Sequence, residues 1–401
     1  MDFSVLLILG LIFLFGYLGG LLANRIGLPK VSGYVLVGII LSPSVTGIIS
    51  NEFLNSSSVI VDFALAMVAF DLGGNLRWNN LKKHKTSILF ITLGQGAGAF
   101  IFVMLGTFIF MKLLFPAFTI NDIFLFSIIF GALSLSTAPA ATMATIHEYR
   151  ARGTLTSTLL AVVAIDDALG ILVFTLTLAF IKVLVLGSNP SFSSFTQPVL
   201  NLIFSTLLGM LAGLILTSIL KNKIEIESVI IFTVAFFCLS FGLAQQFALE
   251  PLFTTMVLGM TVANLFPATK PFEHLEIDYE PIVLAAFFVL AGAHIDISLV
   301  VEYLPLAIVF VIFRLSGKWI GSFIGGILSA APKNISRYIG FGLAPQAGIA
   351  IGLALYLQRL PALEKYSLIA INVIIVKTAI NEIIGPYLLK FALKKTGEAR
   401  K

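Results

Sequence analysis

Long apolar runs separated by short polar breaks dominate the hydrophobic pattern of this sequence. Most runs are close to the length at which an α-helix crosses the hydrocarbon core of a bilayer, roughly 20 residues. The runs predict about 13 helices, over residues 3–23, 31–49, 57–76, 86–115, 121–146, 154–186, 196–220, 228–247, 251–266, 281–294, 302–331, 336–357 and 366–393. The breaks carry turn formers or charges, and none is long enough for a soluble domain. The predicted fold class is therefore all-α, as an integral membrane protein.

Composition supports this class, because 58% of the residues are hydrophobic and only 11% are charged, far from the balance of soluble domains. The run 3–23 has no basic residue before it and no small-residue cleavage pattern after it, so we interpret it as a retained span rather than a signal peptide. The single cysteine, Cys238, excludes an internal disulfide and a cysteine-based metal site. The histidines lack metal-ligand spacing, so we expect neither a metalloenzyme nor a cofactor.

Basic residues are distributed unevenly between the two predicted membrane faces. Loops after odd-numbered spans and the C-terminal tail hold most of the Lys and Arg, whereas the remaining loops hold only Lys112, Lys182, Arg359 and Lys365. Because cytoplasmic loops are enriched in Lys and Arg, the pattern predicts a multi-pass protein with its N-terminus outside and its C-terminus in the cytoplasm. The asymmetry also explains the net charge of +5 without a nucleic-acid partner.

Two adjacent carboxylates interrupt the apolar run 154–186, in the stretch AVVAIDDALGI. Asp166 and Asp167 lie about twelve positions into this run, which places them near the bilayer midplane. Charges at that depth are costly and mark ion pathways or proton relays. The structural alternative is that one Asp pairs with a base while its neighbour faces a polar cavity. That alternative suits a lone Asp better, because consecutive helical positions point about 100° apart and one partner cannot easily neutralise both.

The run 302–331 supplies positive charge at the same depth, in the stretch RLSGKWIG. Arg314 and Lys318 are four residues apart and so lie on one helical face. Lys318 is the predicted partner of one Asp. The protonation of a buried Lys then depends on whether a cation occupies that carboxylate. Arg314 stays charged, and we interpret it as a fixed structural countercharge.

Two other runs carry proline beside small and polar residues at mid-depth. The run 121–146 contains GALSLSTAPAATMA with Pro139, and the run 336–357 contains GFGLAPQAGIAIG with Pro345. One such proline would predict only a kink. Two breaks at matched places in the two halves of a chain instead indicate discontinuous helices at a transporter binding site.

The halves of the chain correspond when the first six spans are laid on the last six, with residues 187–221 as a connector. The two proline breaks then align, and VAFDLGGNLRW corresponds to FFVLAGAHIDI. An odd connector inverts the second half, so the sequence predicts two inverted six-helix repeats. Lys377 then lies at nearly the depth of Asp166. We interpret it as a structural charge, paired with Glu382 or a helix C-terminus, with a bridge to the broken helix ends as the alternative.

The stretch STAPAATMATIHEYRARGTLTSTLLAVVAIDDALGI resembles the core of the monovalent cation:proton antiporters, in particular the bacterial sodium/proton antiporter and potassium-efflux branch with an Asp-Asp pair. RLSGKWIG is similar to that branch's Arg-x-x-Gly-Lys-x-x-Gly pattern, and the likeness covers essentially the whole chain. The resemblance implies that Asp167 is the principal site of the cation and the proton. It also implies that Asp166 pairs with Lys318 when no cation is bound, and that Thr137 lies beside the bound ion. Lys377 has no assignment in this pattern.

The resemblance further implies that the two broken helices cross at their breaks, at the midplane of the membrane. It also implies a homodimer in the lipid bilayer of a bacterial inner membrane, working by alternating access. Scaffold helices are expected in 1–85 and 222–300, moving core helices in 86–186 and 301–401, and a connecting helix in 187–221.

A hard alkali cation and a proton both seek carboxylate oxygens, so they compete for one site. The predicted function is exchange of Na⁺, held at Asp166 and Asp167, for protons, and the protein is not expected to be an enzyme. Exchange of K⁺ and a sodium-coupled solute symporter are the alternatives. Participation of Lys318 as a second proton carrier would make the cycle electrogenic, whereas without it the cycle would be electroneutral.

Two further classes and one regulatory role carry less weight. An intramembrane aspartyl protease takes its two carboxylates from different helices, whereas these are adjacent, and a channel needs a continuous pore that the sequence does not indicate.

His147 and His274, near the predicted cytoplasmic side, are candidate pH sensors. We interpret them first as ordinary solvated histidines.

Overall fold

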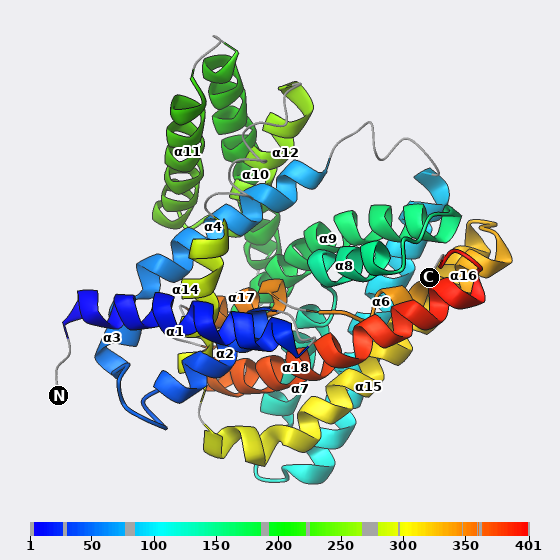
Figure 1. Cartoon of the computed structure of the whole chain (residues 1–401), viewed down its shortest axis with the longest axis horizontal. Helices are drawn as coiled ribbons and strands as arrows, with labels where there is room; N and C mark the ends of the chain where they lie inside the picture. The colour runs from blue at the N-terminus through cyan, green and yellow to red at the C-terminus, as the bar shows by residue number, and fades with distance from the viewer. Residues whose placement is uncertain are drawn as a thin grey trace.

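The computed structural model describes residues 4–26, 30–76, 85–185, 192–221, 225–266, 280–295, 297–346, 348–358, 360 and 363–399. Within these ranges the chain forms α-helices and turns and no β-strand (Figure 1). His274 and Arg359 lie outside the described residues, as does the side chain of His147.

Each predicted run overlaps one helix or a pair of helices. The run 31–49 is helical only as far as Leu41, because Pro43 cannot continue a helix, and the short helix Asn51–Ser56 lies outside every predicted run. The first half contains α1 (Val5–Arg25), α2 (Lys30–Leu41), α3 (Asn51–Ser56), α4 (Ser58–Asn75), α6 (Lys85–Leu114), α7 (Ile120–Leu133), α8 (Pro139–Glu148) and α9 (Thr154–Val185). The second half contains α10 (Phe192–Leu220), α11 (Ile226–Gln246), α12 (Pro251–Leu265), α14 (Glu280–Ala293), α15 (Ile297–Leu328), α16 (Lys333–Gly342), α17 (Gly348–Leu357) and α18 (Glu364–Lys395). The predicted all-α class is confirmed.

The two runs with proline among small and polar residues at mid-depth are each divided into two helices. The run 121–146 forms α7 and α8, and the run 336–357 forms α16 and α17, with non-helical backbone between the members of each pair. Pro139 is the first residue of α8, where its missing N–H costs nothing and its fixed φ suits a helix start. Pro345 lies within the second break. Both prolines therefore mark interruptions of a helix rather than kinks.

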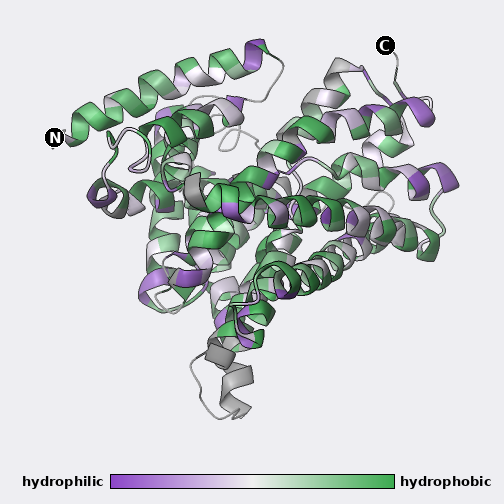
Figure 2. Ribbon diagram, turned by 90° about the horizontal axis from the view of Figure 1, so that it is seen from below, coloured by the Kyte–Doolittle hydropathy of each residue, from purple (hydrophilic) through white to green (hydrophobic). Residues whose placement is uncertain are grey.

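The described helices include seven that are long and apolar enough to cross a membrane, or eight if the bent pair in α18 counts as one span. Hydrophobic residues predominate along the helices, and hydrophilic ones gather at many helix ends and turns (Figure 2). The protein is thus a multi-pass membrane protein. The halves of the broken helices are only 10 to 14 residues long, which is too short for independent spans. The total of 13 spans and the inverted repeats stay predictions.

Close packing through glycine joins α6 to α15, which cross each other in the lower right of Figure 1. A Cβ on Gly321 would overlap the carbonyl oxygen of Gly94, and one on Gly317 would overlap that of Gly98. Lipid is as apolar as the side chains, so helices in a membrane associate by close van der Waals packing, which small residues permit. The backbones of α6 and α15 consequently approach each other at the level of the polar residues that α15 carries.

A small hydrophobic cluster lies at one end of the molecule, apart from the large one. It joins the end of α8, the beginning of α9, α16 and the last turns of α18, through buried residues such as Ile146, Leu155, Ile339 and Leu393. Ala399, which follows α18, packs against this cluster.

Gly321→Ala tests the contact between α6 and α15. The added Cβ would push against backbone that cannot retreat, so we expect a loss of about 1–3 kcal/mol in the free energy of unfolding and a lower melting temperature in detergent. Gly10→Ala is the matched control, because nothing lies within 4 Å of its Cβ position and alanine favours a helix over glycine. Equal melting temperatures for the two variants would contradict the packing described here.

Candidate functional site

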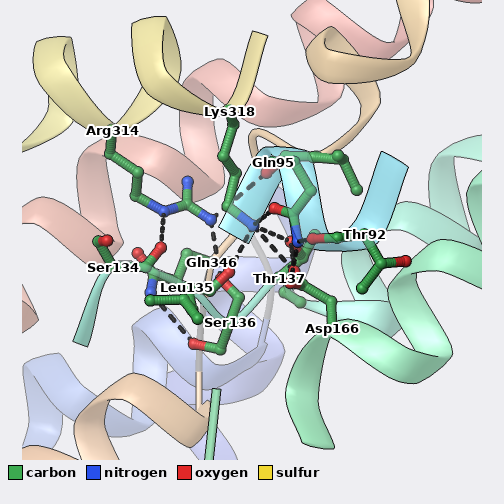
Figure 3. Close-up of polar contacts among 12 residues, drawn as sticks. Thr92, Gln95, Ser134, Leu135, Ser136, Thr137, Asp166, Arg314, Lys318 and Gln346 are labelled. Atoms are coloured by element: carbon green, nitrogen blue, oxygen red, sulfur yellow. Dashed lines mark hydrogen bonds and ion pairs between the residues drawn. The ribbon is translucent and has the colours of Figure 1, made fainter. Parts of the chain in front are cut away.

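The predicted acid–base pair meets at the centre of the structure, between α9 and α15. The Nζ of Lys318 lies 2.8 Å from the Oδ2 of Asp166, and both side chains are fully buried. Lys318 also donates to the Oε1 of Gln95 and to the Oγ1 of Thr137, each at 2.7 Å, and to the carbonyl of Leu135. The ammonium thus reaches α6, the break after α7, and α9 (Figure 3).

The carboxylate of Asp166 is satisfied on both oxygens. Gln95 donates through Nε2 to Oδ1, while Thr137 and Lys318 donate to Oδ2. A buried ion pair is stable only when further hydrogen bonds satisfy the remaining donors and acceptors. Gln95, with one oxygen on Lys318 and one nitrogen on Asp166, provides part of that satisfaction.

The neighbouring carboxylate, Asp167, lacks such hydrogen-bond partners. It is fully buried, and neither oxygen has a hydrogen bond of good geometry within the described part of the chain. The backbone N–H of Thr137 lies close enough to act on it electrostatically. Thr137 therefore faces both carboxylates, with its hydroxyl on Asp166 and its amide toward Asp167.

Arg314 binds the interrupted ends of both broken helices. Its Nε and Nη2 donate to the carbonyls of Ser134 and Ser136 at 2.9 and 2.8 Å, beyond the end of α7. Its Nη1 donates at 2.7 Å to the carbonyl of Ala344, and Nη2 also donates at 3.3 Å to that of Leu343, beyond the end of α16. The last carbonyls of a helix are unsatisfied and carry negative partial charge. Arg314 places a positive charge at two such ends.

The two breaks also contact each other directly. The backbone N–H of Ala138 donates to the carbonyl of Pro345 at 3.0 Å. Gln346, from the second break, donates to the carbonyl of Leu133 at 2.8 Å and to the Oγ of Ser136 at 3.1 Å. The segments that interrupt the two helices are thus hydrogen bonded side to side.

Lys377 lies at the second break rather than at the Asp pair. It donates to the Oε1 of Gln346, and its Nζ lies 5.1 Å from the centre of the Phe310 ring. This is the bridge to the broken helix ends that the sequence left as an alternative. The side chain of Glu382, the other partner considered, lies outside the described residues.

Sequence reasoning gave no role to Gln95, which contacts both members of the ion pair. A signal was present, because Gln95 is a polar residue within the glycine-rich stretch GQGAG of an apolar run, and polar side chains in membrane helices face protein rather than lipid. The carbonyl of Leu135 has no signal in the sequence, since every residue carries one.

Comparisons with known proteins place the chain in a family. The sequence profile of the family described as "Sodium/hydrogen exchanger, transmembrane" matches residues 10–395. The chain belongs to this sodium/hydrogen exchanger family. It is accordingly a transporter and not an enzyme.

Relatives of the chain include exchangers of different cations. The chain is 24% identical to a Na⁺/H⁺ antiporter of Enterococcus hirae, over 97% of this chain and 98% of that one. It is 22% identical to the K⁺/H⁺ antiporter subunit KhtU of Bacillus subtilis, over 86% of each. Among solved structures, the sodium proton antiporter MjNhaP1 from Methanocaldococcus jannaschii at pH 8 matches with a TM-score of 0.76 and 18% identity, over 99% of each chain. The antiporter fold is thereby confirmed.

Arg314→Lys tests the contact with the two helix ends. A single ammonium lacks the planar fork that reaches carbonyls on both breaks, so we expect about 1–3 kcal/mol less stability, the cost of buried acceptors left unsatisfied. Thermal unfolding in detergent measures the change. Arg337→Lys, at an exposed position, is the control and should melt like the unchanged protein. A wild-type melting temperature for Arg314→Lys would contradict the role described for this residue.

Proposed function

We propose that this exchanger moves Na⁺ against protons, and that Asp167 is the group for which the two ions compete. The unpaired state of the buried Asp167 carboxylate carries this proposal. An isolated ionised carboxylate in an apolar interior is very costly. Asp167 must therefore hold either a proton or a cation whenever the site is closed to water.

The surrounding charges support the choice of Asp167 over Asp166. Lys318 and Gln95 already satisfy Asp166, and Arg314 donates hydrogen bonds to four backbone carbonyls. No described basic side chain forms an ion pair with Asp167. Thr137 and the carboxylate of Asp166 would add oxygen ligands for a hard cation, which prefers them.

Strict coupling follows from the same desolvation cost. A site that is empty and ionised would have to cross the apolar barrier with an uncompensated charge, at a penalty of several kcal/mol. Occupation by one proton or one cation removes most of that penalty. Exchange is then favoured over leak without any separate gate.

The identity of the cation rests on the relatives. The Enterococcus hirae protein is a Na⁺/H⁺ antiporter, and the Bacillus cereus protein GerN, 23% identical over 100% of this chain and 99% of that one, is a Na⁺/H⁺-K⁺ antiporter. We propose Na⁺ first, with K⁺ as the alternative within the same mechanism.

The placement of glycine supports a division into two groups of helices that move against each other. Glycine brings backbones together within 86–186 and 301–401, between α6 and α15, and within 1–85 and 222–300, as where Gly73 meets α12 and Gly292 meets α2. Between the two groups, Gly352 of α17 instead meets the side chain of Leu65. Side chains slide more readily than interlocked backbones. We propose the first group as the moving core, the second as the scaffold, and 187–221 as the connection.

Two further parts of the proposal concern the setting of the protein. We propose a homodimer formed by scaffold helices in a bacterial inner membrane. The distribution of Lys and Arg supports an N-terminus outside and a C-terminus in the cytoplasm.

Asp167→Asn tests the assigned ion site. The amide keeps the volume and removes the charge, so we expect complete loss of cation-dependent proton flux in a protein that still folds. Proteoliposomes with a trapped pH dye, given Na⁺, Li⁺ or K⁺ in turn, measure the flux and identify the ion. Glu225→Gln is the control, because this exposed acid makes no side-chain capping bond. Normal exchange by Asp167→Asn would exclude Asp167 as the site.

Lys318→Gln tests whether a second proton is carried. If Lys318 releases its proton when a cation reaches Asp166, the cycle moves net charge, and voltage contributes about 2.3 kcal/mol per charge per 100 mV. We expect the variant to retain exchange and to lose its response to an imposed potential, set with K⁺ and valinomycin while Na⁺ drives exchange. Voltage dependence equal to that of the wild type would exclude Lys318 as a carrier.

A further inference from the structure

The C-terminal end of α18 folds into a turn that directs the tail back onto the protein. Gly397 has a φ of +72°, its N–H donates to the carbonyl of Lys394 at 3.2 Å, and the N–H of Glu398 donates to that of Leu393 at 3.0 Å. This pair of bonds with a left-handed glycine is the Schellman arrangement that ends many helices. It turns residues 396–399, here called the tail strap, away from the axis of α18.

The tail strap places the carboxylate of Glu398 on the first turn of α9. Its Oε1 accepts from the N–H of Leu155 at 2.7 Å, and its Oε2 accepts from the N–H and Oγ1 of Thr156 at 2.8 and 2.7 Å. The N–H of Arg152 donates to the backbone carbonyl of Glu398 at 3.3 Å. The first N–H groups of a helix have no partner within it and carry positive partial charge. Glu398 therefore caps α9 from a distant part of the chain, with charge-assisted bonds.

Two observations show that the surroundings fit this contact. A Cβ on Gly153 would overlap the carboxyl group of Glu398. Only glycine at this position, just before α9, therefore leaves room for the cap. Ala399 packs against the small cluster formed by the ends of α8, α9, α16 and α18. The tail strap is thus enclosed on both sides.

The capped helix is the one that carries the aspartate pair. Asp166 and Asp167 lie on α9, about three turns beyond the cap, and α18 carries Lys377, which contacts the second break through Gln346. Because a helix transmits displacement along its axis, the cap fixes α9 relative to α18 and to the breaks.

We propose that Glu398 is a positioning residue for ion exchange: its contact with α9 holds Asp166 and Asp167 at the depth where the cation binds. This inference rests on the proposed function, since it takes the Asp pair as the ion site. Glu398 itself contacts no ion. Its loss should weaken cation binding through the position of α9.

Three variants of the whole 401-residue chain test the inference. Glu398→Ala removes the cap, Glu398→Gln keeps an acceptor oxygen without the charge, and Glu227→Ala is the control, an exposed acid in the first turn of α11. Hydrogen exchange of residues 154–158 reports the cap. The NaCl or KCl concentration at half-maximal thermal stabilisation, with choline chloride to balance ionic strength, reports cation binding, and proton flux is measured in parallel.

For Glu398→Ala we expect exchange in the first turn of α9 to become about fivefold to tenfold faster, as for the loss of a strong cap. The half-maximal cation concentration should rise several-fold. Glu398→Gln should fall between this variant and the wild type, and Glu227→Ala should match the wild type. Faster hydrogen exchange with unchanged cation binding would overturn the inference, because the cap would then be only structural.

A second experiment changes Gly153, the residue that the Glu398 carboxylate lies against. Gly153→Ala displaces the carboxylate without altering any charge, so it should also weaken cation binding. Combined with Glu398→Ala it should add nothing further, since both changes break one contact, and additive effects would overturn the inference. A wild type that is stabilised by cations but shows no flux would refute the proposed exchange and leave the positioning role intact. A wild type that no cation stabilises would refute both.

Discussion

The binding of two interrupted helix ends by Arg314 is the contact on which the rest of the site depends. A helix broken within a bilayer leaves carbonyls that no water reaches, and each unsatisfied group costs several kcal/mol. Arg314 satisfies carbonyls from both breaks at once. Its N–H groups donate to those carbonyls, and Lys318 is the described basic side chain that forms the ion pair with Asp166. No described basic side chain forms an ion pair with Asp167, and the proposed exchange depends on this difference between the two aspartates.

The same stretch of α15 both packs the helix and equips the site. In RLSGKWIG, Gly317 and Gly321 face the backbone of α6, while Arg314 and Lys318 face the breaks. Each pair is four residues apart and therefore follows one face of the helix. Close approach to α6 is also what brings Gln95 within reach of Lys318. The spacing in this stretch thus serves both the packing against α6 and the placement of positive charge at the breaks.

How far the sequence could predict this site depends on the kind of signal each residue gives. Charges and prolines are rare in the middle of apolar membrane-spanning runs and therefore stand out. Asp166, Lys318 and both breaks could be located from the amino-acid pattern alone. Gln95 is a weaker exception, and the carbonyl of Leu135 is none. Glu398 sits among other polar residues of a tail, and nothing local indicates that it caps a helix more than 200 residues away in sequence. Contacts of that kind depend on tertiary geometry, which pattern alone does not contain.

The burial of the site makes movement necessary for the proposed exchange. Asp166, Asp167 and Lys318 are all fully buried, so no ion reaches them from either side of the membrane in this conformation. The interlocked backbones of α6 and α15 resist displacement, because any slide would drive glycine faces onto side chains. Opening must then use surfaces where side chains meet, such as that between Leu65 and α17. If the proposed core moves against the proposed scaffold, the cap that ties α9 to α18 would keep the aspartates and the breaks together during that movement, with the ion between them.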